Sequence, residues 1–255
     1  MQVINSRNLL NLHGFQNMKK YILMSFSVIF MLFSPFLLRG QSVGKGNYNY
    51  LDFNKKNYYF GITLAYNKSN FKVYRGKNFL LNDSIAGLES IKGPGFNLQI
   101  VSNLKLGENF DVRFLPGFSF GERHVEYDPT RKNAKNTDKS IESVFVELPF
   151  HVRYKSAPYY DKRLFVMGGM KYSYDIQAKS RQRTIANNLR ISPTDFQVEM
   201  GAGIQMFFPY FIFSPEIKFS HGIGNILIYQ NGVKESNVIE KLMSRTFTIS
   251  LHFEG

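Results

Sequence analysis

Apolar and polar residues alternate along eight segments of the chain. In the segment 144–154, Leu148 and Phe150 fall on one face of an extended strand, and Glu147 and Arg153 fall on the other. Alternation with period two predicts β-strands that have one apolar and one polar face, because a helix would mix the two sets. The eight segments are 60–67, 96–106, 110–121, 144–154, 164–174, 196–208, 211–220 and 247–254.

The connectors between these segments are alternately short and long. The short ones are 107–109, 155–163 and 209–210, and the long polar ones are roughly 68–94, 122–142, 175–194 and 221–245. Strands of about ten residues with this order of connectors predict an eight-stranded antiparallel up-and-down transmembrane β-barrel with short periplasmic turns and long external loops. The interpretation as a soluble β-barrel stays open, because its strands also alternate. In the last long connector, 236–243 is expected to form a short amphipathic helix or an ordered turn.

The N-terminal part of the chain has the pattern of an export signal. Residues 21–38 carry no charge and follow Lys19 and Lys20, as in a secretory signal peptide. A retained membrane anchor is the alternative, because 18 apolar residues could just span a bilayer. We expect an upstream extension and signal peptide over 1–40, a mature start near Gln41, a short lead over 41–57, and an outer-membrane barrel over 58–255.

Composition narrows the choice of protein class. The 255 residues include no Cys, which excludes disulfides, thiolate metal sites and a Cys nucleophile. Aromatic residues make up 16%, too many for a disordered or collagen-like chain. A mean hydropathy of −0.23 is too polar for a bundle of membrane helices but fits alternating barrel strands. The net charge of +13 is dispersed along the chain, so nucleic-acid binding is not expected.

The polar faces place charged residues of both signs inside the predicted barrel. An eight-stranded barrel has an interior that side chains fill, and buried charges there must be paired. We therefore expect a structural plug in the lumen, with Glu147 paired to Arg113 on the preceding strand. The predicted plug consists of Arg113, Glu147, Arg153, Lys171, Glu199, Glu216 and Lys218.

Motifs for catalysis or for cofactors have little support. The stretch 117–121 matches G-x-S-x-G, but Ser119 lies inside an alternating strand and not at the strand-to-helix turn that a nucleophile elbow needs. The stretch 40–45 is one residue short of a phosphate-binding loop. The five His residues have no metal-site spacing. We expect a protein that is not an enzyme and has no cofactor, metal or small-molecule substrate.

The long connectors hold dense positive charge. Loops carry recognition more often than strands, so we name Arg131, Lys132, Lys135 and Lys139 as a candidate partner-docking loop. A second basic loop contains Arg181, Arg183 and Arg190. The alternative is a solvated surface that contacts anionic lipid headgroups.

Four stretches of the sequence resemble a known family. They are 93–98, 111–123, 146–156 and 168–175, and the blocks R-F-L-P-G and E-L-P-F within them are the more specific parts. Together these stretches resemble the PorT/SprT family of Bacteroidetes outer-membrane β-barrels. The resemblance covers most of 55–255.

The resemblance implies a non-enzymatic accessory component of a machinery for protein secretion (type IX) and gliding motility. Its expected partners are outer-membrane lipid and other subunits of the secretion complex. The alternative function is that of a stand-alone small outer-membrane barrel acting as an adhesin, a ligand binder or a structural membrane protein.

Overall fold

The computed structural model describes residues 46–76, 85–129, 137–178, 190–229 and 238–255. Among these residues, one short helix and twelve strands are labelled. They are α2 (Tyr48–Asn54), β1 (Tyr58–Arg75), β2 (Ile85–Ile91), β3 (Gly93–Lys105), β4 (Phe110–Phe114), β5 (Gly117–Pro129), β6 (Thr137–Lys155), β7 (Lys162–Asp175), β8 (Arg190–Ile191), β9 (Thr194–Phe207), β10 (Ile212–Gly222), β11 (Leu227–Ile228) and β12 (Ile239–Glu254). No helix among the described residues is long and apolar enough to cross a membrane.

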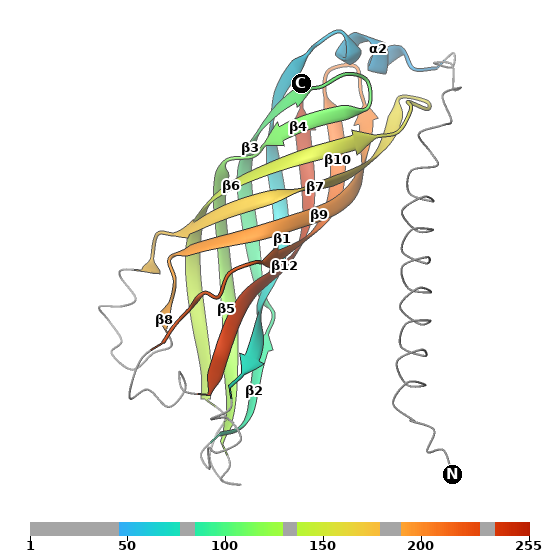
Figure 1. Cartoon of the computed structure of the whole chain (residues 1–255). Helices are drawn as coiled ribbons and strands as arrows, with labels where there is room; N and C mark the ends of the chain where they lie inside the picture. Colours follow the sequence, from blue (N-terminus) through green and yellow to red (C-terminus); the bar gives the residue numbers. More distant parts are fainter. Residues whose placement is uncertain (1–45, 77–84, 130–136, 179–189, 230–237) are drawn as a thin grey trace, which may run out of the picture. The chain divides into compact units, whose positions relative to one another are not determined.

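The large sheet closes on itself. Its order is β1-β12-β10-β9-β7-β6-β4-β3-β5-β2, and β1 also pairs with β3 while β5 pairs with β6. Because β4 and β5 are two parts of one strand and β2 continues β3, the described residues form a ring of eight antiparallel strands (Figure 1). The predicted eight-stranded antiparallel barrel is confirmed. The small strands β8 and β11 pair separately with each other.

The interruption between β4 and β5 has a simple chemical cause. Pro116 lies in the gap, and Pro149 lies on the neighbouring strand β6. Neither residue has a backbone N–H, so the ladder loses hydrogen bonds at this level. The strand nevertheless keeps its register, because Phe114 is opposite Phe150 and Gly117 is opposite Glu147. The Leu115 N–H also donates to the Pro149 carbonyl at 3.1 Å.

The two faces of every ring strand follow the alternation in the sequence. On β6, Phe150 is 51% exposed on the outer wall, whereas Glu147 and Arg153 are buried inside. The outer wall is apolar on all sides of the ring, and the inner wall is mostly polar. A closed ring pairs all of its strands, which is the condition that a lipid environment imposes on a sheet.

The strands extend further toward the long connectors than predicted. β1 continues to Arg75, where its last residues pair with the beginning of β12. β5 and β6 stay paired up to Tyr127 and Thr137. The predicted helix or turn over 236–243 is therefore wrong for Ile239 onward, which is strand. An apolar cluster inside the ring holds the extensions of β1 and β12 together: Phe71, Ile226, Val238, Ile239 and Leu242.

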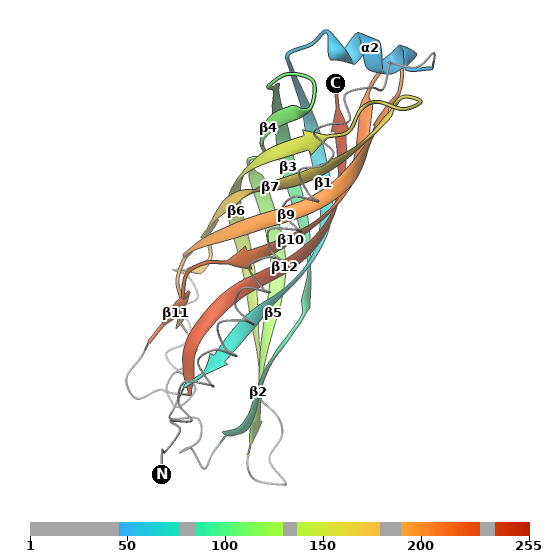
Figure 2. The same cartoon turned by 45° about the vertical axis from the view of Figure 1, so that its right-hand side comes forward.

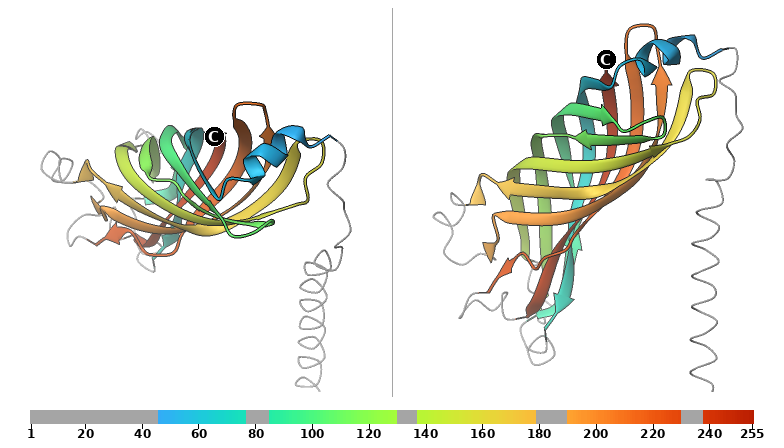
Figure 3. Two further views of the ribbon diagram at one scale, coloured as in Figure 1. Left: turned by 90° about the horizontal axis from the view of Figure 1, so that it is seen from above. Right: turned by 45° about the horizontal axis from the view of Figure 1, so that its top comes forward.

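The three short turns lie at one end of the ring, which we call the short-turn end. The end that carries the long connectors is the long-loop end. The C-terminus of β12 and the helix α2 also lie at the short-turn end (Figures 1 and 3). The helix lies within the predicted lead 41–57, for which no helix or strand was predicted. With seven residues it is too short to be stable alone, so its packing against the barrel must stabilise it.

The outward orientation of Phe150 can be tested by a charge substitution. Phe150→Arg places a cation in the middle of the apolar wall and should cost about 2–4 kcal/mol of unfolding free energy in a bilayer. Phe150→Leu is the control, because it stays apolar and should cost much less. The measurement is denaturant unfolding in lipid vesicles. If a cysteine introduced at 150 reacts freely with a water-soluble reagent in intact membranes, this face of β6 is not in lipid.

Candidate functional site

The interior of the ring contains as many buried acids as buried bases. Seven carboxylates and seven basic side chains are buried among the described residues. A balanced set can neutralise itself in pairs, which offsets the high cost of burying each charge. The acids are Asp111, Glu147, Asp175, Asp195, Glu199, Glu216 and Glu254, and the bases are Arg113, Arg123, Arg153, Lys155, Arg163, Lys171 and Lys218. All seven residues of the predicted plug are in this set.

A first group of these charges centres on Lys171 and Glu199. Lys171 Nζ lies 2.9 Å from Glu147 Oε1 and 3.4 Å from Glu199 Oε1, so one ammonium bridges two carboxylates. His151 Nε2 lies 2.6 Å from Glu199 Oε2, and the Ser220 hydroxyl donates to Glu199 Oε1 at 2.5 Å. The predicted pairing of Glu147 with Arg113 is wrong, because Glu147 pairs with Lys171 on the following strand.

Arg113 instead reaches across the interior to β12. Its Nη2 lies 2.5 Å from Glu254 Oε1, and its Nε donates to the Asn103 side chain at 3.3 Å. β4 and β12 are not neighbours in the ring, since β3 and β1 lie between them. Glu216 pairs with His252: His252 Nε2 lies 3.4 Å from Glu216 Oε2. Interior partners are therefore not restricted to adjacent strands.

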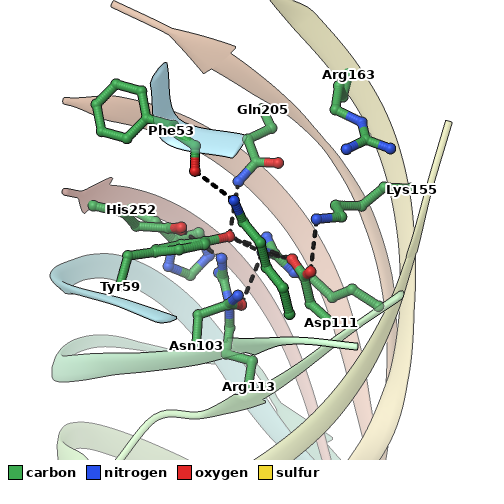
Figure 4. Close-up of polar contacts among 12 residues, drawn as sticks. Phe53, Tyr59, Asn103, Asp111, Arg113, Lys155, Arg163, Gln205 and His252 are labelled. Atoms are coloured by element: carbon green, nitrogen blue, oxygen red, sulfur yellow. Dashed lines mark hydrogen bonds and ion pairs between the residues drawn. The ribbon is translucent and has the colours of Figure 1, made fainter. Parts of the chain in front are cut away.

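A second group fills the interior near the short-turn end (Figure 4). Asp111 accepts from two cations, at 2.8 Å from Arg153 Nη2 and 2.6 Å from Lys155 Nζ. The Tyr59 hydroxyl accepts from Arg153 Nη2 at 2.9 Å and from Gln205 Nε2 at 3.1 Å. Asp111 thus holds two of the buried bases in place.

The helix α2 closes the interior over this group. Its Tyr50 and Phe53 are buried against Tyr59, Phe207 and Ile212, which form one apolar cluster. The gap beneath is too narrow to hold a water molecule, and it is lined by Tyr50, Tyr59, Lys105, Lys155, Arg163, Gln205, Phe207 and Ile212. At the C-terminal end of α2, the Phe53 carbonyl accepts from Lys105 Nζ at 2.5 Å. A cation at this end of a helix is favourable.

Arg163 fixes the same helix from the side. Its guanidinium lies 5.3 Å from the centre of the Tyr50 ring, and Nη1 donates to the Tyr50 hydroxyl at 3.3 Å. It also donates to the carbonyls of Ser156 at 2.6 Å and Glu108 at 2.8 Å, so it links two short turns. Burial raises the pKa of the Tyr50 phenol above its ordinary value, so the hydroxyl stays protonated.

The N-terminal end of α2 is held by Asp161 in the turn between β6 and β7. The Tyr50 N–H donates to Asp161 Oδ1 at 2.9 Å, and the Asn49 amide donates to Oδ2 at 3.2 Å. In return, the Asp161 N–H donates to the Asn47 side chain at 2.9 Å. This is a reciprocal cap made by two distant segments. Asp161 (φ 54°) and Tyr160 (φ 47°) are both in the left-handed region, so these contacts hold a strained turn.

The two kinds of motif examined in the sequence, a nucleophile elbow and a metal site, can be compared with the described residues. Ser119 lies within β5 and donates to Asn97 Oδ1 at 3.0 Å, so it is part of a strand as predicted. No group of three or more His, Asp or Glu side chains in the described residues is arranged to hold a metal ion.

The candidate docking loop falls mostly outside the described part of the chain. Arg131, Lys132 and Lys135 lie outside it, as do Arg181 and Arg183. The backbone of Lys139 belongs to β6, where it is opposite Val125. Arg190 is the first residue of β8.

Sequence reasoning left several members of the interior network out of the predicted plug. They are Tyr59, Asp111, His151, Lys155, Arg163, His252 and Glu254. The signal that could have found most of them is the alternation itself. Asp111, His252 and Glu254 stand on the polar faces of their predicted strands and have the same parity as the residues that were named.

The Glu147–Lys171 pair can be tested by a double-mutant cycle. Glu147→Gln leaves the Lys171 ammonium with Glu199 alone and should cost roughly 3–5 kcal/mol of unfolding free energy. Lys171→Gln should also destabilise, and the double variant should cost less than the sum because the two side chains interact. The Glu147→Gln, Arg113→Gln combination is the control and should be closer to additive. Additivity for Glu147 and Lys171 would contradict the pair.

The attachment of α2 can be tested at Asp161. Asp161→Gly removes the carboxylate, while glycine accepts the positive φ, so the variant isolates the lost contacts. We expect α2 docking to weaken by about 2 kcal/mol, which raises the undocked population roughly 30-fold. Hydrogen exchange of the amides in 48–54 measures this. Asp52→Ala removes only an exposed pair with Lys55 and should change exchange little. Equal exchange in the wild type and Asp161→Gly would contradict the cap.

The similarity of this chain to known proteins identifies its family. No curated protein matches it. Among solved structures, Neisserial surface protein A has 10% identity and a TM-score of 0.40 over 77% of this chain and 96% of its own. OprG from Pseudomonas aeruginosa has 9% identity and a TM-score of 0.45, over 77% of this chain and 93% of its own. Ail of Yersinia pestis has 12% identity and a TM-score of 0.35, over 78% of this chain and 100% of its own. Residues 41–227 match the family described as outer membrane protein beta-barrel domain, and the chain belongs to that family.

Proposed function

We propose that this outer-membrane barrel is a non-enzymatic accessory component of a protein-secretion machinery, of the type IX and gliding kind, which acts by docking other subunits. The observation that carries the proposal is the filled interior. Fourteen buried charged side chains occupy it, and α2 covers the short-turn end. A polypeptide has no room to pass, so a role in secretion must be exerted through the outer surfaces.

The resemblance to the PorT/SprT family is the reason for proposing a type IX secretion and gliding machinery. Its two specific blocks, 113–117 and 147–150, lie side by side on neighbouring strands of the ring. They meet where Pro116 and Pro149 interrupt the ladder, and they bring Arg113 and Glu147 into the interior. The blocks are thus one unit of the barrel wall. They support membership of a particular barrel group, but they offer no free surface for a partner.

Two polar surfaces remain for partners, one at each end of the ring. The long-loop end carries the basic connector with Arg131, Lys132 and Lys135. The short-turn end faces the periplasm in barrels of this class, and α2 forms part of it. We place the docking surface on the basic connector, because loops are free of the alternation that constrains the strands.

Gene deletion separates the proposed function from the alternative of a stand-alone adhesin, ligand binder or structural barrel. Loss of a secretion component should leave many cargo proteins inside the periplasm, and the wild-type gene should restore their export. A deletion strain that exports all cargo at the normal rate and loses a single surface property would contradict the proposal and favour the alternative.

Shortening of the basic connector tests the docking surface. The segment to replace by an Asn-Gly turn is 130–136, since Thr137, Asp138 and Lys139 are strand residues paired with β5. The barrel should still fold and insert, and export of cargo should fall in the complemented strain. The control is the same replacement of 230–237, a connector of similar length with one Lys and one Glu. Full export with the 130–136 variant would exclude this connector as the docking surface.

A further inference from the structure

Four basic residues form a strip on the outer wall at the long-loop end. Lys68 and Lys72 lie on β1, and Lys241 and Arg245 lie on β12. Their positions have the same parity as the outward-facing residues Tyr66 and Phe247 of these two strands. β1 and β12 are paired along this stretch, and their ends lie next to each other in Figure 2. We call these four residues the basic strip.

The register brings the four cations together. Lys68 is opposite Phe247, and Lys72 is opposite Met243, which stands between Lys241 and Arg245 on the same face of β12. Successive residues on one face of a strand are roughly 7 Å apart, and paired strands are about 5 Å apart. Each cation is therefore within reach of the same small, multiply charged group as its neighbours.

The basic strip begins directly beyond a row of aromatic residues on the wall. Tyr66 is opposite Phe96 on one side, and Phe247 is opposite Phe219 on the other. Aromatic side chains mark the level of the interface in a membrane barrel, with the apolar band below them. The basic strip therefore lies at the headgroup level of the external leaflet, facing lipid and not the interior.

The basic strip lacks carboxylate partners. Within the described residues, none of its four side chains has an acid at ion-pair distance, in contrast to the interior cations Arg153, Lys155 and Lys171. Two of the cations lie over an aromatic ring instead: Lys72 Nζ is 4.9 Å and Lys241 Nζ is 6.0 Å from the centre of the Tyr74 ring. Glu240 precedes Lys241 in the chain but forms no ion pair in the described residues. Unneutralised cations side by side repel each other, and an anion between them would remove that repulsion.

We propose that the basic strip binds the phosphate groups of lipids in the external leaflet of the outer membrane. Lysine and arginine hold phosphate by charge-assisted hydrogen bonds, and basic residues at a membrane surface each add to the attraction for anionic headgroups. The apolar wall directly below would receive the acyl chains of the same lipid. A free phosphate would lack that second contact, so the lipid is the stronger ligand.

The test compares two charge-matched triple variants of the purified barrel. The first is Lys68→Gln, Lys72→Gln, Lys241→Gln, which removes three charges of the basic strip. The control is Lys55→Gln, Lys56→Gln, Lys162→Gln, which removes three exposed charges at the short-turn end. Folding of each is checked by resistance of the barrel to heat in detergent. Native mass spectrometry then counts the bound lipid for lipid A, for lipid A stripped of its phosphates, and for lipid A in the presence of inorganic phosphate.

The wild type and the control should bind lipid A alike, and the strip variant should bind it at least about tenfold more weakly. Removing the phosphates from the lipid should weaken binding to the wild type by a similar factor. Inorganic phosphate at the same phosphate concentration should compete poorly. Equal binding by the strip variant and the wild type, equal loss in the control, or undiminished binding of the phosphate-free lipid would each overturn the proposal. Strong competition by inorganic phosphate would overturn the choice of the lipid as ligand.

Discussion

Closure of the sheet is the constraint on which the rest of this structure depends. A sheet in lipid has no water to satisfy its backbone groups, so the strands must pair around a complete ring. Once the ring is closed, each strand has one face toward lipid and one toward an interior that is too narrow for solvent. Alternation then becomes obligatory. A register shift of one residue would turn the buried charges of a whole strand toward lipid.

The interior has a constraint of its own, which is electrical balance. Equal numbers of acids and bases are buried among the described residues, and some of them are shared: Lys171 contacts two acids, and Asp111 contacts two bases. Such a shared network has no single essential pair. It does have a net charge that must stay near zero, because an unpaired ion in this space has no access to water. Balance therefore restricts the composition of the interior more strongly than it restricts any one contact.

This difference explains what the sequence could and could not predict. The strand faces and the ring follow from local alternation, and Phe150 and Glu147 lie where the pattern places them. Interior partners depend instead on reach across the lumen, so Arg113 finds Glu254, 141 residues away. The helix α2 was missed because seven residues give little periodic signal, and its cap comes from Asp161 in a distant turn. The long-loop ends of β1 and β12 were missed because an apolar cluster of residues distant in the sequence stabilises them.

Residues of the interior and residues of the two rims affect different properties of the barrel, namely its stability and its recognition of other molecules. Changes to the buried network alter the free energy of folding, because they leave charges uncompensated. Changes to exposed side chains at either rim alter charge and contact area without disturbing the ring. The basic connector joins β5 and β6 at the long-loop end, and no residue of the basic strip belongs to the interior network. A variant of either one that loses binding while keeping heat resistance therefore reports on recognition, and the closed interior is what makes that separation clear.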